Sequence, residues 1–269
     1  MPGMTIYADL YRYRELFGSL FRRDLRAKYK GSVLGLAWSL AHPLLLAGVY
    51  IVVFSVLWRA GAVDFDHYPL FLLSGLGVWV FFGSSLQLSS RALLENANLI
   101  RKVRFPRQLV PLSIVATQLP SLVVLLALVG ALNLALVPGT RDWAWVAFPL
   151  AIPFVALVAG IALAVASLNA LYRDVEHVVQ ALLLPWFFLT PVLYRLGDVP
   201  GADEHPWLEK VLHYGNFMTP PIEAIRQPLF FGVAPRAVDV VYLLVASVAA
   251  LALGAFVFTR VDDRIAVEV

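Results

Sequence analysis

Residues 144–169 read AWVAFPLAIPFVALVAGIALAVASLN, a run that contains no charged side chain. About 18–20 consecutive apolar residues suffice for a helix to cross the hydrocarbon core of a membrane. Five similar runs occur elsewhere, so we predict six spans, at roughly 36–58, 69–90, 109–137, 144–169, 178–194 and 240–259. The sequence therefore predicts an all-α polytopic membrane protein with a single transmembrane domain over residues 1–269.

The composition supports a membrane protein. The chain of 269 residues is 60% hydrophobic and 14% charged, whereas an average soluble domain is about 25% charged. Basic loops that fix the orientation explain the net charge of +3, so we expect no nucleic-acid partner. The absence of cysteine excludes disulfides and thiol-bound metals. The first 30 residues hold seven Lys or Arg and no early apolar core, so we expect no signal peptide there.

Lysine and arginine in the connectors predict the orientation. With the N-terminus inside, residues 1–35, 91–107, 170–177 and the tail from 260 hold 15 of them. The opposite side holds six, namely Arg59, Arg141, Arg195, Lys210, Arg226 and Arg236. Cytoplasmic connectors are enriched in these residues, so we expect both termini in the cytoplasm.

Two segments differ from both spans and ordinary loops. Within residues 9–34, ELFGSLFRRDLRAKYKG (15–31) alternates apolar and basic groups at helical spacing, which is typical of an amphipathic helix lying in the cytoplasmic interface with its basic groups toward anionic headgroups. The outer segment 196–238 holds six prolines and two short amphipathic pieces, at 207–214 and 220–231. We predict re-entrant or interfacial half-helices there, with a plain extracellular loop as the alternative.

Several kinds of chemistry are missing from the sequence. It has no GxxxxGK[ST], HExxH or GxSxG, and its five histidines are scattered. We therefore expect no catalytic residue, metal site or nucleotide site on this chain. The GLG at 75–77 is interpreted as helix packing. Because the predicted spans contain no Asp, Glu, Lys or Arg, ion-driven transport is disfavoured, and energy for any transport would come from another chain.

Aromatic residues gather in spans one, two and five. Aromatic faces offer sugar rings an apolar, weakly directional contact, so one interpretation is a surface along which a glycan slides. Membrane anchoring and core packing are the alternatives. The candidate channel aromatics are Tyr50, Phe54, Trp79, Phe82, Trp186, Phe187, Phe188 and Tyr194.

Four segments in register, spread over nearly the whole chain, point to a known family. They are RRDLRAKYKGSVLGLAWSLAHPLL (22–45), NANLIRKVRFPRQLVPLSIV (96–115), YRDVEHVVQALLLPWFFLTPVLY (172–194) and NFMTPPIEAIRQPLF (216–230). These segments resemble the membrane subunits of type-2 ATP-binding-cassette exporters, in the branch that exports O-antigen, capsule and teichoic acid.

The resemblance implies a permease of the bacterial inner membrane with no enzymatic activity of its own. It would be a homodimer working with two copies of a nucleotide-binding ATPase subunit, and that subunit would hold the ATP and Mg. The expected substrate is a lipid-linked (undecaprenyl-type) polysaccharide such as O-antigen. Export of teichoic acid, capsule or galactan is the alternative within the family; a drug exporter, a lipid-linked membrane enzyme or a passive channel are more distant ones.

The resemblance also assigns roles to residues. Residues 91–105 would be the coupling helix that docks into the ATPase, with contacts from Glu95, Asn96, Asn98, Leu99, Ile100, Arg101 and Lys102. The basic helix would be the interface or gate helix, and its candidates for holding a lipid phosphate, or alternatively membrane headgroups, are Arg22, Arg23, Arg26, Lys28, Tyr29 and Lys30. Cytoplasmic support would come from Tyr172, Arg173 and Asp174. A docking helix also explains why NANLIRKVRFP (96–106) stops at Pro106 before span three.

Overall fold

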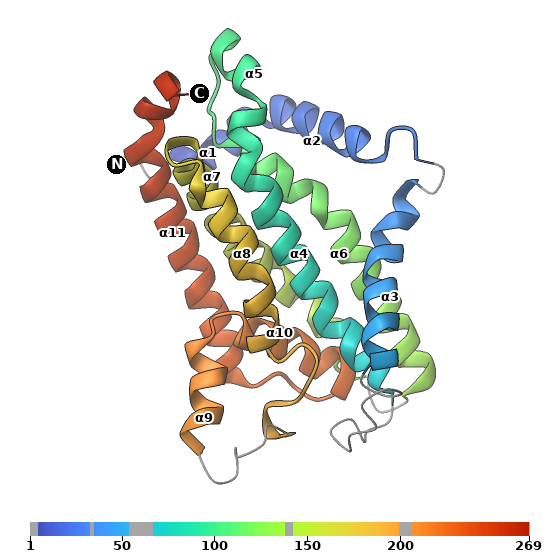
Figure 1. Cartoon of the computed structure of the whole chain (residues 1–269). Coiled ribbons are helices and arrows are strands. Elements are labelled where there is room, and N and C mark those ends of the chain that lie inside the picture. Colours follow the sequence, from blue (N-terminus) through green and yellow to red (C-terminus); the bar gives the residue numbers. More distant parts are fainter. Residues whose placement is uncertain (1–4, 33–34, 54–66, 138–141, 199–205, 269) are drawn as a thin grey trace.

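The computed structural model describes residues 5–32, 35–53, 67–137, 142–198 and 206–268, and the regular structure in these ranges is helical. Figure 1 shows a bundle of long helices with both chain ends at one pole. At this pole lie α1 (Thr5–Arg12), α2 (Arg14–Tyr29) and α5 (Ala97–Lys102), and we call it the basic end. The short helices α9 (Pro206–Lys210) and α10 (Thr219–Arg226) lie at the opposite pole, the α10 end.

Four helical segments are long and apolar enough to cross a membrane. They are α4 (Tyr68–Glu95), α6 (Leu109–Leu136), α7 (Ala147–Leu171) with the single turn Ala144–Val146 before it, and the apolar part of α11 (Ala237–Glu268). These coincide with predicted spans two, three, four and six. Of the most apolar window of α4, 83% is buried, against 22% for α11. The core is therefore built around α4, whereas α11 leaves most of its apolar surface for lipid.

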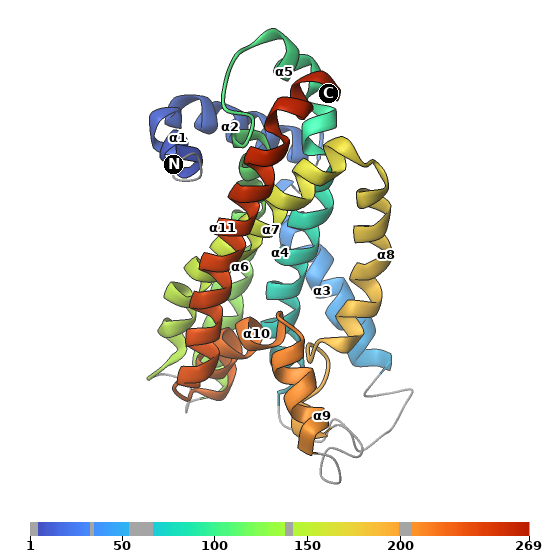
Figure 2. The ribbon, with the colours of Figure 1, turned by 90° about the vertical axis from the view of Figure 1, so that its left-hand side faces the viewer.

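The other two predicted spans are shorter helices. α3 (Trp38–Ile51) covers the first part of 36–58, of which residues 54–58 lie outside the described ranges. α8 (Asp174–Leu189) has 16 residues, or about 24 Å, which is short of a hydrocarbon core of about 30 Å. The helix ends because Thr190 takes extended angles and Pro191 follows, so residues 190–194 form turns rather than the end of a span. Both helices run beside α4 (Figure 2).

Helices α7 and α11 meet backbone to backbone through small residues. A Cβ added at Gly254 would overlap the carbonyl oxygen of Gly160, and one added at Gly160 would overlap the backbone of Ala250. Ala250 and Gly254 share the small-xxx-small spacing that lets membrane helices approach closely. This contact holds the two helices together along the bundle.

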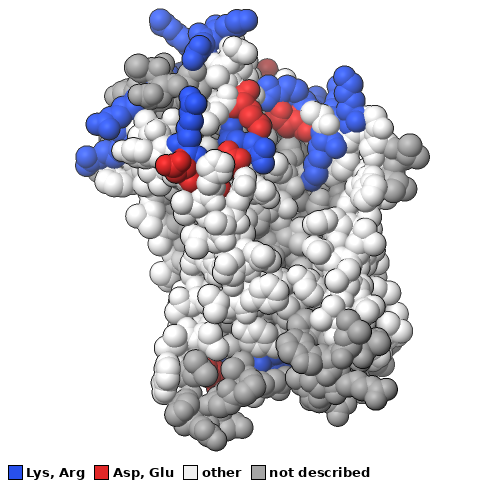
Figure 3. Space-filling model, in the orientation of Figure 1, with Lys and Arg blue, Asp and Glu red and all other residues white. Residues whose placement is uncertain are grey.

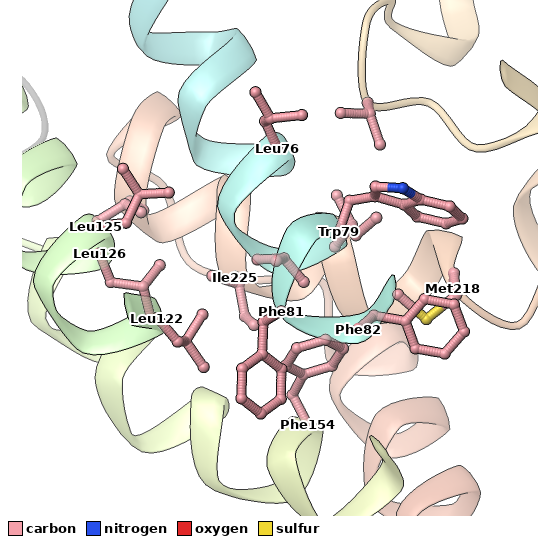
Figure 4. Packing of buried hydrophobic residues seen from close by; sticks show 14 of the residues in the cluster. Leu76, Trp79, Phe81, Phe82, Leu122, Leu125, Leu126, Phe154, Met218 and Ile225 are labelled. Atoms are coloured by element: carbon pink, nitrogen blue, oxygen red, sulfur yellow. The ribbon is translucent and has the colours of Figure 1, made fainter. Parts of the chain in front are cut away.

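The main core lies where α4 faces α6, α7 and the α10 end. In Figure 4, Phe81 of α4 lies against Phe154 of α7, with ring centroids 5.8 Å apart. A Cβ on Gly77 would come within 2.6 Å of the Leu125 side chain, so a glycine is needed for α6 to approach α4. This contact supports a helix-packing role for Gly77 of the GLG.

Helix α2 lies across the basic end of the bundle (Figures 1 and 2). The amphipathic helix expected over 9–34 is divided at Tyr13, where the backbone angles of −106° and 29° leave the helical region. Leu20 is buried in a second cluster with Leu93, Ile100 and Leu109. Protein therefore covers part of the apolar face that the sequence pattern assigns to the membrane interface.

The α10 end is built from short helical pieces. α9 continues into the π-helical turn Val211–Gly215, and α10 continues into the π-helical turn Gln227–Phe231, which ends at Gly232 with φ +66°. Ile222, Ala224 and Ile225 of α10 are wholly buried. The second amphipathic piece predicted from the sequence is therefore part of the protein core and not an exposed loop.

Candidate functional site

The connector between α4 and α6 carries a short helix at the basic end. The coupling helix expected over 91–105 is in fact two helices, because α4 runs on to Glu95 and α5 covers only Ala97–Lys102. They separate at Asn96, whose side-chain Nδ2 donates to the carbonyl oxygen of Ala92 at 2.9 Å and whose backbone leaves helical angles. Val103 is extended, which ends α5 before Pro106.

One face of α5 is attached to the bundle and the other is open. Ile100 is buried in the cluster with Leu93 and Leu109, and Leu99 is half-buried beside it. Asn98, Arg101 and Lys102 are exposed, as is Glu95 at the end of α4. The predicted docking residues thus divide into an anchoring set and an accessible set.

A polar contact connects α2 to this connector. Arg23 donates from Nη2 to Oδ1 of Asn96 at 2.7 Å, and from Nε to Asp24 at 2.7 Å. The contact joins positions 73 residues apart in sequence, where α4 gives way to α5. Movement of α5 would therefore reach α2 directly.

The remaining basic residues of α2 divide between two sides. Arg22, Arg26 and Lys30 line an open hollow on the outer surface of the helix. Figure 3 shows how Lys and Arg gather at this end, above a band of uncharged surface. Lys28 instead reaches Oε1 of the buried Gln118 on α6 at 2.8 Å, and its ammonium lies 5.5 Å from the Tyr29 ring centroid. Five of the six predicted phosphate candidates therefore line this hollow, namely Arg22, Arg23, Arg26, Tyr29 and Lys30, and Lys28 is the exception.

The connector before α8 carries Tyr172, Arg173 and Asp174 on the surface at the basic end. The residue that holds this connector is Asn169, which the sequence analysis missed. Its Nδ2 donates to the carbonyl oxygen of Ser90 at 2.9 Å, and its Oδ1 accepts from the backbone N–H of Glu176 at 2.8 Å. Asn169 thereby ties α7 to α4 and caps the first turn of α8.

Predicted channel aromatics from α3, α4 and α8 meet in one cluster. Tyr50 stacks on Phe187 with centroids 5.5 Å apart, and Phe187 lies 5.6 Å from Trp79. Trp186 lies 5.4 Å from Phe82. Spacing in sequence alone could not show this convergence.

Some residues of this aromatic cluster border a hollow, and Phe82 is buried in the core. Tyr50, Trp79 and Phe187 border a hollow of about 360 Å³ between α3, α4 and α8, which we call the aromatic hollow. Phe82 is wholly buried and packs behind it, so in this conformation it lines no path.

Three further channel candidates are not among the residues that line this hollow. Phe188 packs against Phe187, with ring centroids 5.3 Å apart. Phe188 is 50% exposed on α8, and the Tyr194 hydroxyl donates to the carbonyl oxygen of Phe188 at 3.3 Å. Phe54 lies outside the described residues.

Arg226 is the main residue that sequence reasoning misread. It counts as an outer loop charge in the orientation argument, yet its side chain is wholly buried at the α10 end. Its guanidinium donates to the carbonyl oxygens of Pro191 at 2.7 Å and Val192 at 3.2 Å, and to Glu223 at 3.0 Å. Burial lowers the pKa of Arg226, and the Glu223 carboxylate opposes that shift.

The pocket of Arg226 is shaped by α4. The guanidinium carbon lies 4.1 Å from the ring centroid of Phe71, a cation–π geometry. A Cβ added at Gly75 would overlap the Arg226 side chain. Gly75, the first glycine of the GLG, therefore makes room for an arginine, a role that its neighbours in sequence do not reveal.

Among the described residues, no group of three or more His, Asp or Glu side chains is placed to hold a metal ion.

A protein-family model described as "ABC-2 type transporter" matches residues 15–230. The chain is 38% identical over 198 residues to the O-antigen export system permease protein RfbA of Myxococcus xanthus, an alignment that covers 73% of this chain and 74% of that protein. Two proteins of the same name from Klebsiella pneumoniae are 32% and 33% identical over 201 and 195 residues, with 72% of this chain and 73% of each relative covered.

Proposed function

This chain belongs to the ABC-2 type transporter family, and from that premise we propose that it is the membrane subunit of an ATP-driven exporter of lipid-linked O-antigen. The proposal rests on the relatives named as O-antigen export permeases, which align with about three quarters of this chain. A permease of this family is a transporter subunit and not an enzyme, so ATP and Mg would be held by a separate ATPase subunit. The functional unit would contain two copies of this chain and two ATPase subunits, in line with the usual twofold symmetry of oligomers.

The observation that carries the proposal is the architecture of α5. It projects from the basic end and leaves Asn98, Arg101 and Lys102 accessible, while Ile100 fixes it to the bundle. An ATPase that binds the accessible face could therefore move α4 without first unfolding the connector. This face would lie in the cytoplasm, together with both termini.

Force would pass from α5 into the membrane by two routes. One is α4, the central helix, which leads directly into α5. The other is the hydrogen bond from Arg23 to Asn96, which leads into α2. Coupling of this kind requires elements that move as units, and packed helices meet that requirement.

The substrate would be recognised in two places. Its lipid-linked phosphate groups would be held by Arg22, Arg26 and Lys30 through charge-assisted hydrogen bonds. Its sugars would pass the aromatic hollow, where Tyr50 and Trp79 offer ring faces without strong hydrogen bonds. In the dimer, α3 and α8 would face the partner copy and complete the six-span subunit, with the α10 end closing the exit.

Purification of the chain from host membranes in mild detergent tests the assembly. We expect an ATP-binding subunit to co-purify at a ratio of two to two, with ATPase activity in the complex. Deletion of the gene should remove surface O-antigen from gels of extracted lipopolysaccharide. Loss of a teichoic acid or capsule instead, with O-antigen intact, would contradict the assigned substrate while leaving the transporter assignment in place.

The phosphate role is tested separately by replacing Arg22 and Arg26 with Gln. Arg23 is left in place because it is bonded to Asn96. Export should fall while the amounts of permease and bound ATPase stay normal. Unchanged export would remove the phosphate role and leave headgroup binding as the function of these arginines.

A further inference from the structure

A second hollow, of about 580 Å³, lies between α2, α3, α4 and α6, and we call it the α2–α6 cavity. Its size falls within the range of pockets that bind small ligands. It lies on the α6 side of α4, whereas the aromatic hollow lies toward α8, although His42, Val80, Ser84 and Gln87 border both. Neither the proposed transport path nor the coupling mechanism uses it.

The cavity changes from polar to apolar along the membrane normal. Lys28, Tyr29 and Gln118 line it toward the basic end, and Val80 and Leu125 line it deeper in the bundle. From Gln118 to Leu125 the helix α6 advances about 10 Å at 1.5 Å per residue. A lipid with a polar head and an apolar tail has the same order of polarity over that length.

The polar end is built around a buried amide. Gln118 is 4% exposed, and its Oε1 accepts a hydrogen bond from Nζ of Lys28 at 2.8 Å. Its Nε2 donates to Oγ1 of Thr117 at 2.9 Å, which fixes the amide orientation. An ammonium group has three donors, and the bond to Gln118 uses one of them. Two donors are left for an anion at the mouth of the cavity.

Charge distinguishes this cavity from the basic face of α2. Among its described lining residues, Lys28 is the one with a fixed charge. A single cation matches the single negative charge of a phosphodiester. A polyprenyl diphosphate carries more charge and is matched better by the row of Arg22, Arg26 and Lys30 on the other side of α2.

We propose that the α2–α6 cavity binds a resident anionic phospholipid, with its phosphodiester against Lys28 and an acyl chain extending toward Leu125. The lipid fills the space between α2 and α6 and so helps to set the height of α2 above the bundle. It is a structural lipid and not the transported substrate.

Native mass spectrometry of the full chain, titrated with dioleoyl-phosphatidylglycerol, tests the proposal. We expect Lys28→Gln to weaken binding roughly tenfold, the effect of losing one charge-assisted hydrogen bond. Arg104→Gln is the control, because it removes an equal charge from an exposed residue that does not line the cavity and should leave the affinity unchanged. Ser121→Phe should block binding by filling the cavity while keeping Lys28.

Three other outcomes would overturn the proposal. Equal loss in Lys28→Gln and Arg104→Gln would mean non-specific attraction to a basic surface, and unchanged binding in Lys28→Gln or Ser121→Phe would place the lipid elsewhere. Either result overturns the proposal. Tighter binding of undecaprenyl diphosphate than of phosphatidylglycerol, lost in Lys28→Gln, would also overturn it in favour of a carrier-lipid site. Because the readout is lipid binding, it is independent of whether the exported substrate has been assigned correctly.

Discussion

The two poles of the bundle hold arginine in opposite ways. At the basic end, Arg22, Arg26 and Arg101 are exposed on helices that project from the bundle. At the α10 end, Arg226 is wholly buried, with two backbone carbonyls, a carboxylate and an aromatic ring around it. Exposed charges contribute little to stability, whereas a buried charge is tolerated only when its partners are in place. Charge at the basic end is therefore available for recognition, and charge at the α10 end is structural.

Replacing Arg226 with Met should have the largest effect. It leaves the carbonyls of Pro191 and Val192 and the Glu223 carboxylate without their donor, a loss of about 3–5 kcal/mol in the free energy of unfolding. Thermal unfolding in detergent, followed by tryptophan fluorescence, measures it. Arg236→Met is the control, since Arg236 is exposed at the same end. Similar melting temperatures for the two variants would show that Arg226 is dispensable.

Replacing Gly75 with Ala should act through the same arginine. The new methyl group overlaps the Arg226 side chain, so we expect a loss of about 1–3 kcal/mol. Gly48→Ala is the matched control, because nothing lies within 4 Å of a Cβ there and alanine favours a helix by about 1 kcal/mol. In an Arg226→Met background the penalty of Gly75→Ala should shrink. A penalty of the same size in both backgrounds would point to another cause.

The bond between Arg23 and Asn96 should contribute less. In a double-mutant cycle with Arg23→Gln and Asn96→Ala, we expect an interaction energy of about 0.5–1 kcal/mol, as for other partly exposed polar pairs. Unfolding measurements on the single and double variants provide it. The effects of Asn96→Ala and Arg22→Gln should be purely additive. An interaction energy of the same size for this pair would show that the coupling is not specific to Arg23.

The accessible face of α5 should affect stability least. Arg101→Gln with Lys102→Gln should change the free energy of unfolding by no more than about 0.5 kcal/mol, because both side chains are exposed. ATP hydrolysis by the complex should nonetheless become uncoupled from export, so that more phosphate is released for each polymer exported. Intact coupling in this variant would exclude these residues from docking. Leu99→Ala should uncouple as well, with some loss of stability because Leu99 is half-buried.

The features that follow from local pattern were predictable. Charge-free runs located α4, α6, α7 and α11, because helices in a membrane must satisfy their backbone internally and need a minimum apolar length. The sequence also predicted a short helix in the connector, ending before Pro106. The expected single helix over 91–105 was too long because the side chain of Asn96 bonds back to Ala92 and ends α4 there.

The features that depend on distant contacts were not predictable. Arg226 and Lys28 stand in amphipathic stretches beside other polar residues, and nothing local reveals the burial of Arg226 or the partner of Lys28. Their environments are created by Gly75 and Gln118, far away in sequence. The same limit applies to the aromatic residues. Trp79 and Phe82 are three residues apart on α4, yet Trp79 borders a hollow and Phe82 lies wholly in the core.

The close approach of α7 and α11 determines where the molecule can bend. Sliding one helix past the other would drive backbone atoms together, since Gly160 and Gly254 leave no side-chain layer between them. We therefore expect the pair to move as a single rigid body. Any opening of this fold should accordingly keep the spacing of α7 and α11 and move other helices against this pair.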